Sequence, residues 1–159
     1  MDYSELCADP HLRDLPFKIE LNEYGTIMMT PASNRHALLQ GEIAGLIREI
    51  MKVGRAPTEC SIETSKGVKV ADVAWVSPDF LAEHGGATPF PVAPEVCVEI
   101  VSPSNSQEEM RQKVDLYLAK GAKEVWICSE DGSVSFRSYE GEIPGSKVIP
   151  GMPPKVEVP

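Results

Sequence analysis

An acidic residue lies inside the most apolar segment of this chain. Glu99 stands within residues 95–101, whose sequence is EVCVEIV. Such a nearly continuous apolar run is typical of a strand that is covered on both faces of a sheet. An ionised carboxylate in that environment is unfavourable unless a cation or hydrogen bonds compensate it. The chain must therefore fold so that other groups balance Glu99.

A second acid has the same kind of setting. Asp72 lies within residues 68–76, VKVADVAWV. Side chains alternate between the faces of a strand, so neighbouring strands can bring both carboxylates to one face. Both would then reach one divalent cation, because proteins hold Mg²⁺ through one or two carboxylates. The alternatives are an acid/base pair, or two unrelated acids at strand ends or in structural salt bridges.

Composition limits the classes of function. The 159 residues suffice for one domain with a core, and the net charge of −9 opposes a broad nucleic-acid-binding surface. We expect no membrane association, since no apolar run is long enough to span a bilayer. Four scattered cysteines form no CxxC pair or zinc-binding spacing, and the first residues do not resemble a signal peptide. Together these features favour a reduced, cytoplasmic setting.

The residue patterns predict an α/β (α+β) protein with a mixed central β-sheet flanked by helices. We expect one domain over residues 1–159, with a loose N-terminal arm at 1–16 and a Pro/Gly-rich, mostly irregular tail at 144–159. Between them the patterns predict strands near 17–21, 26–29, 59–64, 68–76, 95–101, 125–128 and 134–137, and helices near 34–53, 79–84 and 107–121. The passage from the Glu99 strand through a helix to residues 125–128 predicts a crossover with parallel strands.

Three further side chains are candidates for the same site. Lys113 borders the apolar stripe of its helix, and its long side chain can reach back over the sheet. His36 and Glu42 lie along the helix at 34–53 and are possible helpers. The alternatives are a surface lysine, a polar histidine at a helix start and an exposed glutamate. Glu20, in the first hairpin, is expected to face solvent.

An ordered set of motifs resembles the Uma2 family of restriction endonuclease-like proteins, also called DUF820. The set covers most of residues 17–138, and its pieces are His36 with the following apolar stripe, ADVAWV at 71–76, VEIVSPS at 98–104, KVDLY at 113–117 and GAKEVW at 121–126. The resemblance implies a PD-(D/E)xK nuclease-like fold with a magnesium- or manganese-dependent phosphodiesterase site. By position, Asp72 and Glu99 would bind the metal and Lys113 would be the site lysine. The usual lysine position, two residues after the second acid, is Val101 here.

The chain departs from the family pattern at several positions that are not candidate ligands: Ala71, Asn105, Glu109, Cys128 and Ser129. The leading hypothesis is a metal-dependent DNA endonuclease that acts as a homodimer, because cutting two strands needs two sites. The alternatives are a catalytically inactive, nuclease-fold nucleic-acid-binding or protein-interaction module, and a purely structural network of buried ions.

Overall fold

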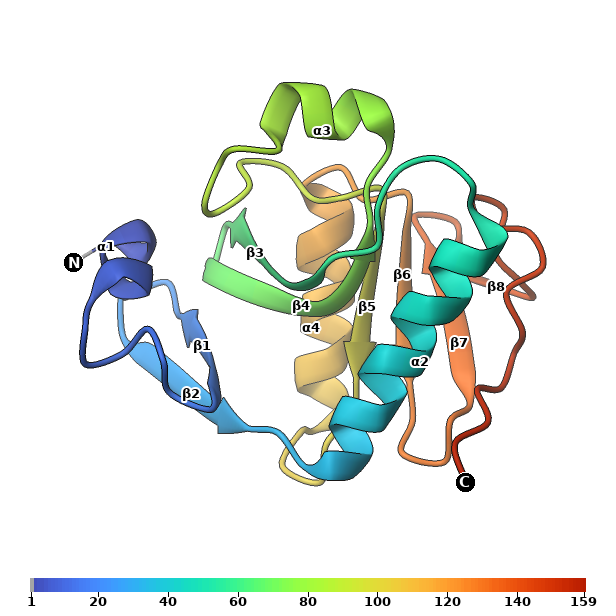
Figure 1. The fold of residues 1–159 in the computed structure, drawn as a ribbon, viewed down its shortest axis with the longest axis horizontal. Helices are drawn as coiled ribbons and strands as arrows, with labels where there is room; N and C mark the ends of the chain where they lie inside the picture. Colours follow the sequence, from blue (N-terminus) through green and yellow to red (C-terminus); the bar gives the residue numbers. More distant parts are fainter. Residues whose placement is uncertain (1) are drawn as a thin grey trace.

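A six-stranded mixed sheet forms the centre of the computed structural model, which describes residues 2–159 (Figure 1). Its strands follow the order β3-β4-β5-β6-β7-β8. Their bounds are β3 Thr58–Thr64, β4 Gly67–Trp75, β5 Val96–Ile100, β6 Glu124–Cys128, β7 Val134–Ser138 and β8 Gly141–Ile143. Only the β5–β6 pair is parallel among these neighbours, and α4 (Gln107–Ala119) connects the two strands. The predicted mixed sheet and the predicted crossover are confirmed.

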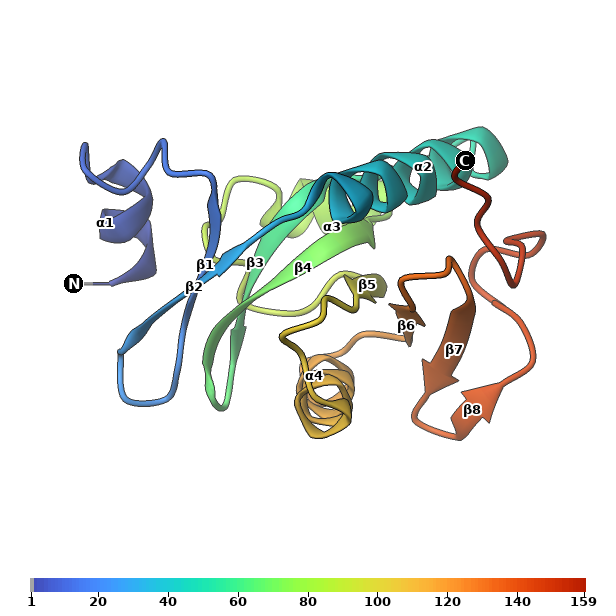
Figure 2. The same ribbon diagram turned by 90° about the horizontal axis from the view of Figure 1, so that it is seen from below.

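Helices cover both faces of the sheet, as Figure 2 shows with α2 (Asn34–Ile50) on one side and α4 on the other. All five residues of β5 and the last six of β4 are buried. One apolar cluster joins α2 to Val73, Val98 and Trp126, and a second joins α4 to Cys97 and Val125. The nearly continuous apolar sequence of these strands follows from this double coverage.

The N-terminal arm is more ordered than predicted. Residues 3–8 form helix α1 (Tyr3–Ala8). Asp2 and Glu5 cap its N-terminus with reciprocal hydrogen bonds. Tyr3 and Leu6 are buried, and the Tyr3 hydroxyl donates to the Ile19 carbonyl at 2.8 Å. The expectation of a loose arm is therefore wrong for this segment, because apolar contacts fix it against the strands that follow.

Strands β1 (Phe17–Leu21) and β2 (Ile27–Pro31) form the predicted hairpin as a separate two-stranded sheet. Together with α1 the hairpin lies beside β3 and β4, at one end of the main sheet (Figures 1 and 2). In the register of the pair, Lys18 lies opposite Thr30 and Glu20 opposite Met28. Lys18 and Glu20 therefore share one face of the hairpin.

The end of α2 and the C-terminal segment differ from the predictions. Helix α2 ends at Ile50 rather than near Val53, and Gly54 lies in the following loop with φ +77°. A Cβ at Gly54 would lie 2.4 Å from the Val76 carbonyl oxygen, so this close approach requires glycine. Strand β8 was not predicted, and the tail after it contributes Ile149, Met152 and Val156 to the core. The short helix α3 (Pro78–His84) agrees with the sequence.

Within residues 2–159, no helix has both the length and the apolar character that crossing a membrane requires.

A buried carboxylate–lysine cluster as candidate active site

Asp72 and Glu99 come from adjacent antiparallel strands. Val73 of β4 pairs with Val98 of β5, so the next step of the register sets Asp72 opposite Glu99. Both side chains are almost completely buried, each with 1% of its surface exposed. The backbone N–H of Ile100 donates to Asp72 Oδ2 at 2.7 Å. The structure thus brings the two acids together, as their strand patterns predict.

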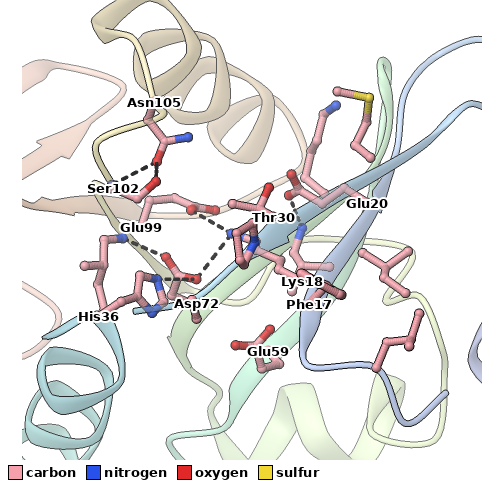
Figure 3. Close-up of a pocket in the computed structure, with 18 of the residues that line it drawn as sticks. Phe17, Lys18, Glu20, Thr30, His36, Glu59, Asp72, Glu99, Ser102 and Asn105 are labelled. Carbon is pink, nitrogen blue, oxygen red and sulfur yellow. Dashed lines mark hydrogen bonds and ion pairs between the residues drawn. The ribbon is translucent and has the colours of Figure 1, made fainter. Parts of the chain in front are cut away.

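Lys18 lies between the two carboxylates (Figure 3). Its Nζ is 3.3 Å from Asp72 Oδ1 and 3.1 Å from Glu99 Oε2. Only 12% of the Lys18 side chain is exposed. The first hairpin therefore supplies the cation that faces both acids.

Lys113 lies on the other side of Glu99, as its helical position predicts. Its Nζ is 3.4 Å from Glu99 Oε1 and 2.9 Å from Glu20 Oε2. The Tyr117 hydroxyl, one turn further along α4, donates to Glu99 Oε1 at 2.7 Å. Glu20 also accepts from the backbone N–H of Val70 at 2.7 Å. The expectation that Glu20 faces solvent is wrong, because the hairpin packs with this side chain directed at the cluster.

Helix α2 orients Asp72 from the opposite side of the sheet. His36 Nε2 lies 3.3 Å from Asp72 Oδ1, and Gln40 Nε2 donates to the Asp72 carbonyl oxygen at 2.8 Å. In the part of the chain that the structure describes, the buried His36 Nδ1 has no hydrogen-bond partner. Glu42 is exposed on α2 and does not line the pocket described below. The structure therefore does not bring Glu42, a possible helper, to the cluster.

The surroundings shift the pKa values of the cluster in different directions. Burial alone would raise the pKa of Asp72, but the hydrogen bond from His36 and the charge of Lys18 hold it well below its usual range. For Glu99 burial prevails over the two lysines, and its pKa is raised. Burial would lower the pKa of Lys18, but Glu99 and Asp72 raise it above the usual value. The hydrogen bond to Asp72 likewise raises the pKa of His36.

The cluster opens into a pocket of about 700 Å³ between the hairpin, α1 and the edge of the main sheet. Asp72, Glu99, Lys18, Lys113 and His36 all line it. Figure 3 shows Ser102 and Asn105, from the loop after β5, beside the cluster. The Ser102 hydroxyl donates to Asn105 Oδ1 at 2.9 Å, which fixes this loop at the pocket wall. The pocket therefore gives a solute access to groups that are otherwise buried.

The donor chemistry of the two acids fits a hard divalent cation, which binds carboxylate oxygens. Among residues 2–159, no group of three or more histidine, cysteine or acidic side chains is arranged as a metal site. Asp72 and Glu99 are thus the two candidate ligands, and water or substrate oxygens would complete the coordination. The Lys18 ammonium occupies the space between these oxygens.

Comparison with known proteins identifies the family. A family model named Uma2 and described as "Putative restriction endonuclease" matches residues 2–143. The chain belongs to the Uma2 family. A solved structure described as "a putative nuclease belonging to DUF820", from Anabaena variabilis, has a TM-score of 0.69 and 21% sequence identity to this Uma2 chain. The likeness covers 82% of this chain and 83% of that chain, and at this identity it concerns the fold. No curated protein matches the sequence.

Sequence reasoning missed Lys18, Glu20, Gln40 and Tyr117 in this Uma2 site. The available signal was weak: alternation in residues 17–21 sets Lys18 and Glu20 on one face, and Tyr117 lies one helical turn after Lys113. Nothing in the sequence indicates that this hairpin face covers buried acids. That arrangement depends on packing between segments more than 50 residues apart.

Proposed function

We propose that this Uma2 protein is a Mg²⁺-dependent endonuclease that hydrolyses phosphodiester bonds in DNA. The observation that carries the proposal is the convergence of two buried carboxylates, Asp72 and Glu99, with Lys113 in one open pocket. Buried, strongly perturbed acids in a cleft mark candidate active sites, because a fold's core does not otherwise favour them. Membership in the Uma2 family supports the same class of reaction.

In this proposal Asp72 and Glu99 hold the cation. When bound, a divalent ion polarises a phosphoryl oxygen and lowers the pKa of an attacking water. His36, Gln40 and the Ile100 amide fix the orientation of Asp72, and Tyr117 fixes that of Glu99. Lys113 would orient the water or stabilise negative charge that develops on the phosphoryl group.

DNA as the substrate and a homodimer as the active form are parts of the same proposal. A double-strand cut needs two copies of the site, which a pair of chains would supply. The net charge of −9 disfavours extensive phosphate contacts, so binding would rest on few cations near the pocket.

One observation favours a second candidate, a catalytically inactive nuclease-fold module that binds nucleic acid or protein. Lys18 already pairs with both acids, which is the arrangement expected of a structural ion network. In such a module the five ion pairs of the cluster would hold the hairpin and the helices against the sheet, and no cation would replace the Lys18 ammonium.

A cleavage assay separates the two candidates. The wild-type protein should nick plasmid DNA with Mg²⁺ or Mn²⁺ and stop when EDTA is added. Asp72→Asn and Glu99→Gln should each lower the rate at least about 100-fold, because each removes a charged ligand. Asp115→Asn is the matched control, since Asp115 is exposed on α4 and forms no ion pair among the described residues. Equal rates for Asp72→Asn and the wild type would refute the proposal.

A further inference from the structure

Lys18 holds the place that a cation would need. Its ammonium lies 3.3 Å from Asp72 Oδ1 and 3.1 Å from Glu99 Oε2, and it contacts one oxygen of each candidate ligand. Lys18 lines the pocket together with both acids, and Figure 3 shows its contacts with them. Bound between the same oxygens, a cation and this ammonium exclude each other by space and by charge.

The charge of the cluster also indicates that a cation and the Lys18 ammonium exclude each other. It contains three carboxylates, two ammonium groups and one imidazole: Glu20, Asp72, Glu99, Lys18, Lys113 and His36. The carboxylates and ammonium groups alone sum to −1, so a doubly charged ion would leave an excess of positive charge in a largely buried site. Removal of the Lys18 ammonium reduces that excess, whereas Lys113 stays paired with Glu20 at 2.9 Å.

The position of Lys18 in the fold allows it to leave. It belongs to the two-stranded hairpin sheet and not to the main sheet, and it lines the open pocket. Its ammonium is carried on a flexible four-carbon stem, so it can withdraw from the acids without unfolding β1. An ammonium so displaced lies at the pocket in which a substrate would bind, and it needs a new anionic partner.

We propose that Lys18 couples cation binding to substrate binding by exchanging its two carboxylate partners for a phosphate of a polynucleotide. The inference rests on the proposed function and adds a positioning residue that favours the cation-bound site when DNA is present. Since coupling between two ligands is reciprocal, DNA should tighten cation binding by the same factor by which the cation tightens DNA binding. Without DNA, the Lys18 ammonium competes with the cation for the two carboxylates, so the wild-type site binds the cation more weakly.

Mn²⁺ binding measured by electron paramagnetic resonance tests the coupling. Free Mn²⁺ would be titrated against the wild type, Lys18→Met and Lys66→Met, each with and without a short DNA duplex, with the signal of DNA alone subtracted. Lys66 is the matched control, because it is exposed in the β3–β4 turn and makes no ion pair among residues 2–159. We expect the duplex to tighten Mn²⁺ binding at least about tenfold in the wild type and the control. Lys18→Met should bind Mn²⁺ about tenfold more tightly than the wild type without DNA and should lose most of the DNA effect.

The outcomes separate this inference from the proposed function. Equal Mn²⁺ affinity of Lys18→Met and the wild type without DNA would overturn the role of Lys18 and leave the metal-dependent nuclease intact. Absence of Mn²⁺ binding in every variant, with and without DNA, would overturn both.

A second measurement needs no variant and is therefore independent of how well Lys18→Met folds. Acylation of lysines by an amine-reactive reagent, read by mass spectrometry, should modify Lys18 slowly in the free wild-type protein. Saturating Mn²⁺ should speed the modification of Lys18 several-fold and leave Lys66 unchanged. An unchanged Lys18 rate with Mn²⁺ bound would contradict the exchange.

Discussion

Asp72 and Glu99 lie on adjacent strands and are both buried, but their pKa values shift in opposite directions. Asp72 receives a backbone N–H, an imidazole and an ammonium, so its pKa is lowered despite burial. Glu99 accepts from the Tyr117 hydroxyl and lies near two ammonium groups, but its burial and the nearby charges of Asp72 and Glu20 raise its pKa. The donors to Asp72 thus prevail over its burial, whereas burial and two neighbouring carboxylates prevail at Glu99.

This difference predicts opposite effects on stability. Asp72→Asn should lower the free energy of unfolding by about 2 kcal/mol at pH 7, because Lys18 and His36 lose their charged partner inside the protein. Glu99→Gln should change it by less than about 1 kcal/mol or raise it, since the ionised Glu99 is unfavourable there. Urea unfolding of both variants measures the two values. A larger loss for Glu99→Gln than for Asp72→Asn would contradict the reasoning.

The lowered pKa of Asp72 also predicts a pH dependence. A carboxyl group whose pKa is lower in the folded state stabilises the fold above its unfolded pKa, near 4, and this contribution is lost as the pH falls. The stability gap between the wild type and Asp72→Asn should therefore shrink steadily below about pH 4. Unfolding measured between pH 2.5 and pH 7 would show it, and a gap that widens in acid would contradict the assignment.

At the scale of elements, the sequence predicted those parts whose pattern is local. The apolar runs of β4 and β5 were recognisable because burial on both faces leaves its pattern within one segment. Helix α1 was missed because its order depends on contacts with Leu21, Val68 and Val70, outside the segment. Strand β8 was missed because only three residues form it.

The placement of Lys18 was unpredictable for the same physical reason. The alternation of side chains assigns Lys18 to one face of β1. That face contacts the two acids only because the hairpin packs against β4. By contrast, Lys113 was predictable as a site residue because the helix after β5 must return across the sheet. Local sequence patterns thus predict part of the candidate site, and tertiary packing determines the rest.

Glu124 anchors the C-terminal segment to the main sheet through hydrogen bonds to residues 146–148. Its buried carboxylate accepts from Trp126 Nε1 at 2.9 Å, the Ser146 hydroxyl at 2.6 Å and the amides of Lys147 and Val148 at 2.8 and 3.0 Å. Glu124→Gln should lower the free energy of unfolding by about 2–4 kcal/mol, because one amide oxygen cannot serve four donors.

Amide hydrogen exchange provides the matching local measurement. In Glu124→Gln the amides of Lys147 and Val148 should exchange faster than in the wild type. Glu140→Gln is the control, since Glu140 makes only an exposed pair with Lys147 at 3.5 Å and should matter by less than about 0.5 kcal/mol. Equal stability of the two variants would show that Glu124 does not anchor the tail.

At the scale of the whole molecule, the net charge of −9 is unusual for a protein that would bind DNA. The cations that line the pocket are few: Arg13, Lys18, Lys69 and Lys113. A neutralised phosphate contributes about −0.9 to the slope of log affinity against log salt, so the slope for duplex DNA should be no steeper than about −4. Fluorescence anisotropy at several NaCl concentrations, with EDTA to prevent cleavage, measures it. A slope near −8 would indicate a basic surface away from the pocket.

The central claim is that Asp72 and Glu99 together hold a divalent cation. Anomalous diffraction from crystals grown with Mn²⁺ and a short DNA duplex tests it most directly. The account predicts one Mn²⁺ peak within roughly 2.2 Å of an oxygen of each carboxylate, with the Lys18 ammonium moved to a phosphate. A map with Lys18 still between Asp72 and Glu99, and no Mn²⁺ bound to either, would contradict it.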